Sequence, residues 1–205
     1  MPLIVERIEK VRESRLSSPD AGIRKLADTP MTFRDTRNPE KAIIIPMVTS
    51  ERRKYIPIGF IFDDVITNSK AQIIPNGTLY HFGVLSSNVH NAWMRAVCGR
   101  MKSDYSYSKD IVYNNFPWPD VTDAQKAEIE KLAQGVLDAR AQYPDSTLAD
   151  MYGETSMLFH TALLNAHREL DKAVMKLYGF PVKDFTEADC VAALMERYQR
   201  LIEEK

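Results

Sequence analysis

A short polar segment, Gly99–Lys109, carries the side chains best suited to read a ligand. If this segment is extended, its side chains alternate between two faces, with Lys102, Asp104, Ser106 and Ser108 on one face and Ser103, Tyr105 and Tyr107 on the other. A lysine beside an aspartate offers a donor next to an acceptor. This pair complements a G·C base pair in the major groove, where the ammonium meets guanine O6 and N7 and the carboxylate meets the cytosine amine. The alternative is an exposed ion pair that contributes at most about 1 kcal/mol.

Catalytic motifs are missing from the sequence. It contains no Gly-rich phosphate loop, no His-Glu-x-x-His, no Cys-x-x-Cys and no Gly-x-Ser-x-Gly. The histidines, His81, His90, His160 and His167, are expected to be solvated or structural. The adjacent pair Asp63-Asp64 is expected to be solvated, because neighbouring residues in a turn point apart. Asn114–Pro119 has the composition of a base-binding loop of amino-methyltransferases but the wrong order. We expect a proline-stiffened junction in which Phe116 and Trp118 pack between domains. The sequence therefore predicts no catalytic residue and no metal site.

Charge is divided unevenly along the 205 residues, although the net charge is only −1. Residues 1–119 carry 17 Lys and Arg against 12 Asp and Glu, whereas residues 120–205 carry 10 against 16. Such asymmetry hints at a polyanion-binding part joined to an acidic part. Apolar runs are too short for a membrane span, and no signal peptide is expected. The widely spaced Cys98 and Cys190 do not form a disulfide framework, which favours the reducing cytoplasm.

The first part of the chain is predicted to be a small β-rich region with flanking helices. Residues 3–16 have the spacing of an amphipathic helix, and residues 17–40 suggest a loop with at most a short helix. Strands are predicted for short apolar runs, and a helix is predicted for residues 86–98, with Gly99 as its left-handed cap. The runs are Ile43–Ile45, Tyr55–Phe62, Ala71–Ile74 and Thr78–Phe82.

The second part is predicted to be entirely helical. Thr122 and Gln125 have the spacing of a capping box, a helix over residues 155–178 should end at Gly179, and Thr186 should cap the last helix. The predicted fold class is therefore α+β. It comprises a β-rich domain over residues 1–119, with its leading helix, and an all-α domain over residues 120–205.

Three long motifs resemble one enzyme family. They are Ser50–Phe60, Ile74–Leu85, and Ala92–Arg100 continuing through Tyr113–Pro119. In this order they look like the carboxyl-terminal part of MmeI-like enzymes. These are single-chain type II restriction-modification proteins in which an endonuclease, an adenine methyltransferase and a target recognition domain lie in series.

The resemblance implies that this chain is the DNA-recognition fragment of such an enzyme. Residues 1–119 would be the target recognition domain and residues 120–205 the helical carboxyl-terminal domain. Lys102 and Asp104 fall where the family places a base-reading pair, and Ser106 and Lys70 fall near positions that read a neighbouring base pair. The methyltransferase and nuclease would lie upstream, with S-adenosylmethionine and Mg²⁺ as their cofactors. Neither cofactor would have a site in this fragment, which would have no catalytic activity of its own.

Double-stranded DNA is the partner that this interpretation implies. Phosphate contacts supply affinity and register, whereas base contacts supply sequence choice. We assign phosphate contacts to six basic residues around the recognition motifs: Arg52, Arg53, Lys54, Arg95, Arg100 and Lys109. The alternative function is a protein-interaction or scaffolding domain whose acidic helices bind a partner chain.

Overall fold

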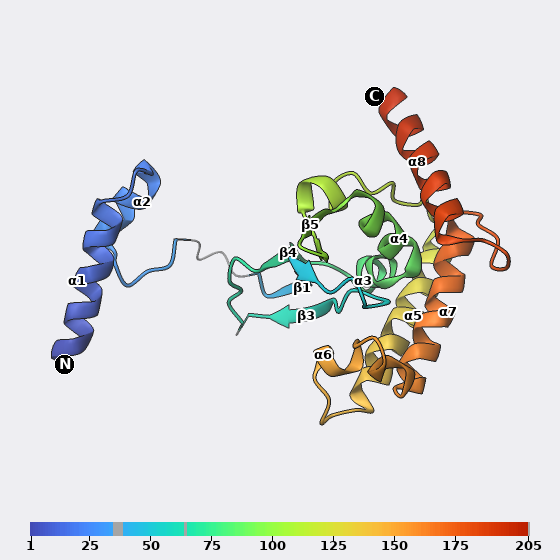
Figure 1. Cartoon of the computed structure of the whole chain (residues 1–205), viewed down its shortest axis with the longest axis horizontal. Coiled ribbons are helices and arrows are strands. Elements are labelled where there is room, and N and C mark those ends of the chain that lie inside the picture. The colour runs from blue at the N-terminus through green and yellow to red at the C-terminus, as the bar shows by residue number, and fades with distance from the viewer. Residues whose placement is uncertain (35–38, 64, 205) are drawn as a thin grey trace. The chain divides into compact units, whose positions relative to one another are not determined.

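The computed structural model describes residues 1–34, 39–63 and 65–204, and it divides the chain into two compact units, Met1–Asn38 and Pro39–Lys205 (Figure 1). Across the described ranges, no helix combines the length and the apolar character that crossing a bilayer requires.

The first unit is a long helix packed against the segment that follows it, residues 17–34, which we call the strap. α1 (Pro2–Leu16) confirms the predicted leading helix, and α2 (Ala21–Lys25) and η1 (Leu26–Asp28) fold back beside it. Asp20 caps α2 by accepting from the N–H groups of Gly22 and Ile23. The Arg15 guanidinium donates to three carbonyls of the strap, those of Leu26, Thr29 and Thr32, at 2.6–2.7 Å. α1 contributes no buried residue, and most of its apolar side chains are exposed.

Two three-stranded antiparallel sheets open the second unit. β1 (Lys41–Pro46) lies between β3 (Gly59–Phe62) and β4 (Ala71–Pro75), and β6 (Asp104–Ser106) lies between β2 (Val48–Thr49) and β5 (Gly99–Met101). Met47 joins the sheets, since its N–H donates to the carbonyl of Lys70 and its carbonyl accepts from Tyr107 N–H. The predicted strand over Tyr55–Phe62 is too long, because only its last four residues pair with β1.

The prediction of a strand over Thr78–Phe82 is wrong, because these residues begin a helix. α3 (Leu79–Ser86) starts at Thr78, whose backbone N–H donates to Nδ1 of His81 at 3.2 Å. Local capping therefore outweighs the β-type composition of the run. α4 (Asn88–Val97) follows at once, capped by Ser87. Gly99 does not cap α4 as predicted, because its φ is not positive and it begins β5.

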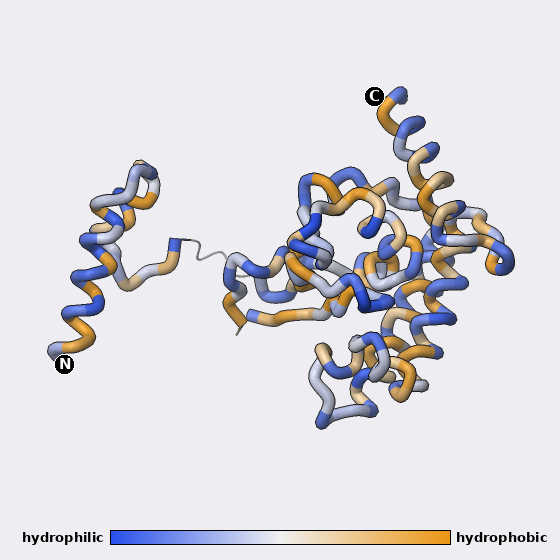
Figure 2. The backbone as a smooth tube through the Cα atoms, viewed as in Figure 1, coloured by the Kyte–Doolittle hydropathy of each residue, from blue (hydrophilic) through white to orange (hydrophobic). Residues whose placement is uncertain are grey.

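The remaining helices cover α3 and α4. α5 (Asp123–Ala141) packs against α3 and α7 (Thr161–Leu177), and α8 (Glu187–Glu203) packs against α4. The short elements η2 (Lys109–Tyr113), α6 (Leu148–Met151) and η3 (Ser156–Leu158) lie in the connections. Figure 2 shows hydrophobic and hydrophilic residues alternating along α7 and α8, as expected for helices with one buried face.

Several local predictions for this helical part are confirmed. Gln125 accepts from the backbone of Thr122 at 2.9 Å, Thr186 caps α8, and Gly179 adopts a φ of 70° after α7. α7 is shorter than expected, since residues 156–158 form η3 instead.

The junction at Phe116–Pro119 packs as expected. The ring of Phe116 lies 5.3 Å from that of Trp118, and the Tyr178 hydroxyl donates to the Pro117 carbonyl at 3.1 Å. One hydrophobic core extends from Ile43 in β1 to Leu194 in α8. The division into domains at residue 119 stays a prediction, because the contacts group residues on both sides of it into one compact unit.

Candidate nucleic-acid interface

The predicted reading segment forms a hairpin rather than one extended strand. β5 and β6 pair with Met101 opposite Asp104, and Lys102 and Ser103 form the turn between them. Lys102 has a φ of 57°, a left-handed conformation that is common in tight turns. The expectation that Lys102 shares a strand face with Asp104 is therefore wrong. Lys102 stands at the tip of the hairpin and is exposed.

Beyond the turn, the expected alternation is present. Tyr105 and Tyr107 are buried, whereas Asp104, Ser106 and Ser108 are half-buried. Since residues opposite each other in a sheet share a face, Asp104 lies on the same face as Met101, and Ser106 lies on the same face as Gly99. The hairpin thus presents an outward face that carries Asp104 and Ser106, with the Lys102 ammonium at its end.

Arg100 belongs to the opposite face. It pairs with Tyr105, and its guanidinium carbon lies 4.1 Å from the centre of that ring. Its Nη1 also donates to the carbonyl of Ser103 at 2.8 Å and lies 3.7 Å from a carboxylate oxygen of Glu51. These contacts hold the turn together, so Arg100 supports the hairpin as well as carrying an exposed charge.

Lys70 is placed near the hairpin by Met47. The Met47 N–H donates to the Lys70 carbonyl at 3.0 Å, and the Met47 carbonyl accepts from the Tyr107 N–H at 2.8 Å. Met47 thus links Lys70 to the residue that directly follows β6. Residues far apart in sequence thus meet at one edge, and the Lys70 side chain is exposed there.

A basic loop follows β2. A turn in which Arg53 N–H donates to the Ser50 carbonyl at 3.1 Å presents Arg52, Arg53 and Lys54 in succession. Arg52 and Lys54 are exposed and Arg53 is half-buried. Within the described ranges, no hydrogen bond or ion pair occupies the guanidinium of Arg52 or Arg53.

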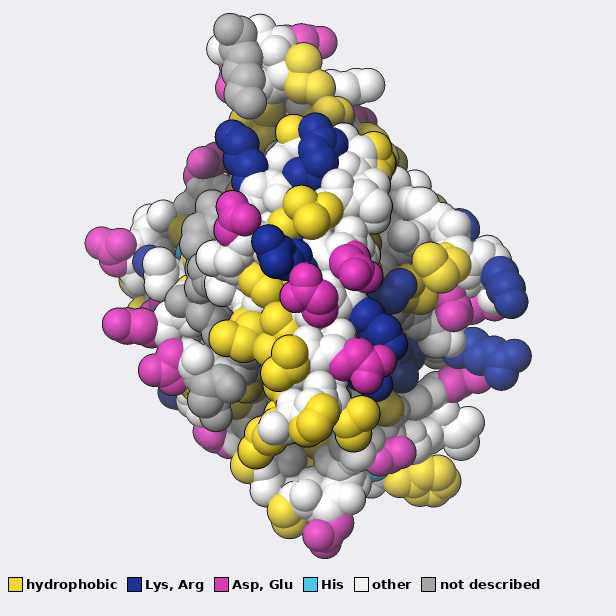
Figure 3. Space-filling model, turned by 90° about the vertical axis from the view of Figure 1, so that its left-hand side faces the viewer, with side chains coloured by type: hydrophobic (Ala, Val, Ile, Leu, Met, Phe, Trp, Pro, Cys, Tyr) yellow, Lys and Arg dark blue, Asp and Glu magenta, His cyan; other side chains and the backbone are white. Residues whose placement is uncertain are grey.

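Arg95 and Lys109 differ from this loop in their surroundings. The Arg95 side chain is only 18% exposed, and its guanidinium donates to Glu187 at 3.1 Å and to the Lys54 carbonyl. Its donors are therefore used within the fold, which does not support a phosphate contact. Lys109 is exposed at the start of η2, 4.0 Å from Asp110. On the face in Figure 3, basic, acidic and hydrophobic side chains all occur.

The histidines occupy structural positions. Burial lowers the pKa of His90 and of His167 to about 3, so both rings are neutral at pH 7. Their Nε2 atoms lie 3.0 Å from the Tyr107 hydroxyl and 2.7 Å from the Tyr152 hydroxyl. In the part of the chain that the structure describes, no three His, Cys, Asp or Glu side chains are grouped to hold a metal ion. Asp64 of the Asp63-Asp64 pair lies outside the described residues.

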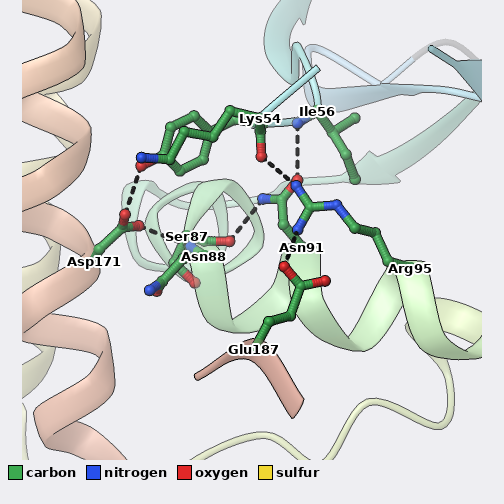
Figure 4. Close-up of polar contacts among 9 residues, drawn as sticks. Lys54, Ile56, Ser87, Asn88, Asn91, Arg95, Asp171 and Glu187 are labelled. Atoms are coloured by element: carbon green, nitrogen blue, oxygen red, sulfur yellow. Dashed lines mark hydrogen bonds and ion pairs between the residues drawn. The ribbon is translucent and has the colours of Figure 1, made fainter. Parts of the chain in front are cut away.

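Sequence reasoning missed a buried polar network behind the basic loop (Figure 4). Asp171 of α7 accepts from the Tyr55 hydroxyl at 2.6 Å and from the Asn88 N–H at 2.8 Å. Burial raises the pKa of Asp171 to about 6. The available signal was an aspartate within the apolar positions of a helix, between Leu170 and Ala173.

Comparisons with known proteins agree on one family. Residues 1–120 match the family model for the MmeI target recognition domain, and residues 121–204 match that for the MmeI C-terminal domain. The chain is 37% identical to DNA methyltransferase A of Bacillus subtilis (strain 168) over 204 residues, which is 98% of this chain and 23% of the relative.

A solved structure of the type IIL restriction-modification enzyme MmeI in complex with DNA also matches. It superposes with a TM-score of 0.90 at 43% identity, over 99% of this chain and 27% of that one. The chain thus spans about a quarter of the length of each of these relatives. With both family models matched in order over residues 1–204, the chain belongs to the MmeI family, of which it contains the target recognition and C-terminal domains.

Proposed function

We propose that this chain is the DNA sequence-recognition module of a restriction-modification enzyme. The observation that carries the proposal is the hairpin, whose inner face is packed through Tyr105 and whose outer face and tip present Asp104, Ser106 and Lys102. A two-stranded ribbon of this kind fits the major groove of B-DNA. The target-recognition family and a relative solved with DNA support the same partner.

Lys102 and Asp104 are proposed to read one G·C pair. The flexible Lys102 side chain at the tip would donate to guanine O6 or N7, and the Asp104 carboxylate would accept from the cytosine amine. The N–H of Glu51 lies 3.4 Å from an Asp104 oxygen, which helps to orient that carboxylate. We assign Ser106 and Lys70 to a neighbouring base pair, because both lie at the edge where the two sheets meet.

The basic loop is proposed to bind the DNA backbone. Arg52 and Arg53 have unoccupied guanidinium groups among the described residues, and Lys54 and Lys109 are exposed. Arg100 would contribute from β5, beside the turn that it stabilises. These contacts would fix register without choosing sequence. Arg95 is left out of this set, because its donors are bound to Glu187 and Lys54.

Catalysis is assigned to the rest of the protein. We propose that a cytoplasmic parent chain carries a site-specific adenine-N6 methyltransferase and an endonuclease, which use S-adenosylmethionine and Mg²⁺. The described residues do not fit a metal site, since no suitable group of His, Cys, Asp or Glu occurs among them.

Selection from random duplexes tests the proposal. The double variant Lys102→Glu, Asp104→Arg reverses donor and acceptor at no net change of charge, so it should change the preferred base at one position. A good bidentate contact discriminates by about 1–3 kcal/mol, which such a selection resolves. Glu169→Lys with Lys172→Glu reverses an exposed ion pair on α7 and is the matched control.

Two outcomes would contradict the proposal. An unchanged base preference in the hairpin variant would remove the base-reading assignment. If the unchanged chain bound duplex DNA without any salt dependence, or did not bind it, the protein-interaction alternative would be favoured.

A further inference from the structure

The chain leaving the basic loop is held along its length by the helices. Over Lys54–Ile58, where no strand forms, successive backbone and side-chain groups are bound by polar side chains of other elements. The bound groups and their partners are Lys54 O with Arg95, Tyr55 Oη with Asp171, Ile56 N with Asn91, and Ile58 O with Arg140. The last three distances are 2.6, 2.9 and 2.8 Å.

Asp171 connects this segment to two helices at once. It belongs to α7, binds the Tyr55 hydroxyl through one carboxylate oxygen, and accepts from Asn88 N–H, in the first turn of α4, through the other. Figure 4 shows Asp171 and Asn91 meeting the segment from different helices. Because a helix amino terminus favours negative charge, α4 stabilises the carboxylate that binds Tyr55.

Arg140 provides a second anchor from α5. Its Nη1 donates to the Ile58 carbonyl, and its Nε donates to the Tyr152 hydroxyl at 2.9 Å. Tyr152 in turn is hydrogen-bonded to His167, whose ring stacks on Tyr55 with centroids 4.2 Å apart. The two anchors are thus parts of one buried network.

The basic loop is therefore fixed at both ends. On its amino-terminal side Thr49 pairs with Tyr105 in the hairpin sheet, and on its carboxyl-terminal side Tyr55 is bound by Asp171. Only a few residues separate these points, among them Arg52 and Arg53. The network does not bind these guanidinium groups, while it restricts the backbone that carries them.

We propose that Asp171 and Arg140 are positioning residues through which the helical part sets the place of the phosphate-binding loop relative to the base-reading hairpin. The inference rests on the proposed function and deepens it, because it gives the acidic helical part a role in DNA binding without DNA contact. A loop held in its bound conformation loses less conformational entropy on binding, so affinity rises although no further group touches the DNA.

Asp171→Asn is the test variant. The amide oxygen can still accept from Asn88 N–H, but the amide nitrogen can only donate to the Tyr55 oxygen, so the hydrogen bond from the Tyr55 hydroxyl to a charged carboxylate is lost. Glu169→Gln, an exposed carboxyl on the same helix, is the matched control. Tyr55→Phe is a second variant that deletes only the hydroxyl. All are compared under conditions in which urea unfolding shows the chain to be folded.

Two measurements separate positioning from a general loss of stability. The first is the rate of trypsin cleavage after Arg52, Arg53 and Lys54, which reports how firmly the loop is held without DNA. We expect at least a 10-fold increase for Asp171→Asn. The second is the dependence of log affinity on log salt, whose slope changes by about 0.9 for each phosphate that the protein no longer neutralises. We expect the slope to become less steep by an amount equivalent to roughly one to two phosphates, with the preferred sequence unchanged.

The results that would overturn the inference are distinct from those against the proposed function. Cleavage rates and salt slopes in Asp171→Asn and Tyr55→Phe equal to those of Glu169→Gln would show that the network does not position the loop. Absence of salt-dependent binding by the unchanged chain would overturn the proposed function, and with it the phosphate role of the loop, whatever trypsin shows.

Discussion

Removing the Tyr55 hydroxyl should destabilise the fold by an amount that depends on pH. In Tyr55→Phe, one oxygen of the buried Asp171 loses its donor at 2.6 Å. A hydrogen bond to a charged group contributes about 1.5–3 kcal/mol, so we expect a loss of about 2 kcal/mol above pH 8, where the carboxyl is ionised. The wild-type pKa of Asp171 is raised to about 6 by burial, and loss of the donor should raise it further.

The pH dependence follows from that further rise. Below pH 5 the Asp171 carboxyl is protonated in both folded proteins, so the charged hydrogen bond no longer distinguishes them. For each unit by which the pKa of Asp171 is higher in the variant than in the wild type, Tyr55→Phe should lower the free energy of unfolding by about 1.4 kcal/mol more at high pH than at low pH. Urea unfolding at pH 5 and pH 8.5 measures both values.

A matched control is Tyr178→Phe. The Tyr178 hydroxyl donates to the neutral Pro117 carbonyl at 3.1 Å. Its removal should cost about 1 kcal/mol, the typical net value of a neutral hydrogen bond, at either pH. The reasoning would be refuted by an equal cost of Tyr55→Phe at both pH values, or by a pH-dependent cost of Tyr178→Phe.

Two further predictions concern packing and acid stability. A Cβ at Gly83 would lie 2.7 Å from Ile129 Cγ2, so Gly83→Ala should destabilise the fold by about 1–3 kcal/mol. Gly135 has open space around it, so Gly135→Ala should stabilise the fold by about 0.5–1 kcal/mol. Urea midpoints that reverse this order would contradict the α3–α5 packing. His90 and His167 have lowered pKa values in the folded state, so below about pH 6.5 the unfolded chain binds protons that the folded chain does not. Acidification from pH 6.5 toward pH 3 should therefore destabilise the fold. Asp171, whose pKa is raised, opposes this between about pH 6 and 4, so replacing it by Asn should steepen the loss in thermal melts recorded over that range.

Features that depend on a few adjacent residues followed from the sequence. Thr122 with Gln125, Thr186, and Gly179 mark helix ends through contacts within one turn, and the structure has all three helix boundaries there. The alternation from Asp104 to Ser108 likewise follows from strand geometry. The charged pair Lys102 and Asp104 was identifiable because its residue types and spacing suit a G·C pair; its role stays a prediction.

Other features were decided by contacts between distant residues. A run such as Thr78–Phe82 satisfies the composition of a strand, but without a neighbouring strand it becomes a helix capped by Thr78 and packed on α5. Lys102 could not be assigned to a turn, because only the pairing of β5 with β6 requires a reversal there. The composition of a segment does not specify its partner strand.

The sequence by itself determined the family resemblance, the α+β class, most helices and the candidate reading residues. Only the tertiary structure decided that Arg95 is bound to Glu187, that Lys70 lies beside the hairpin, and that Asp171 holds Tyr55 across 116 positions. The physical reason is range. Helix capping and hydrophobic periodicity depend on residues within one turn or one strand. A buried polar group needs a hydrogen-bond partner, and which residue provides it depends on how helices distant in sequence pack.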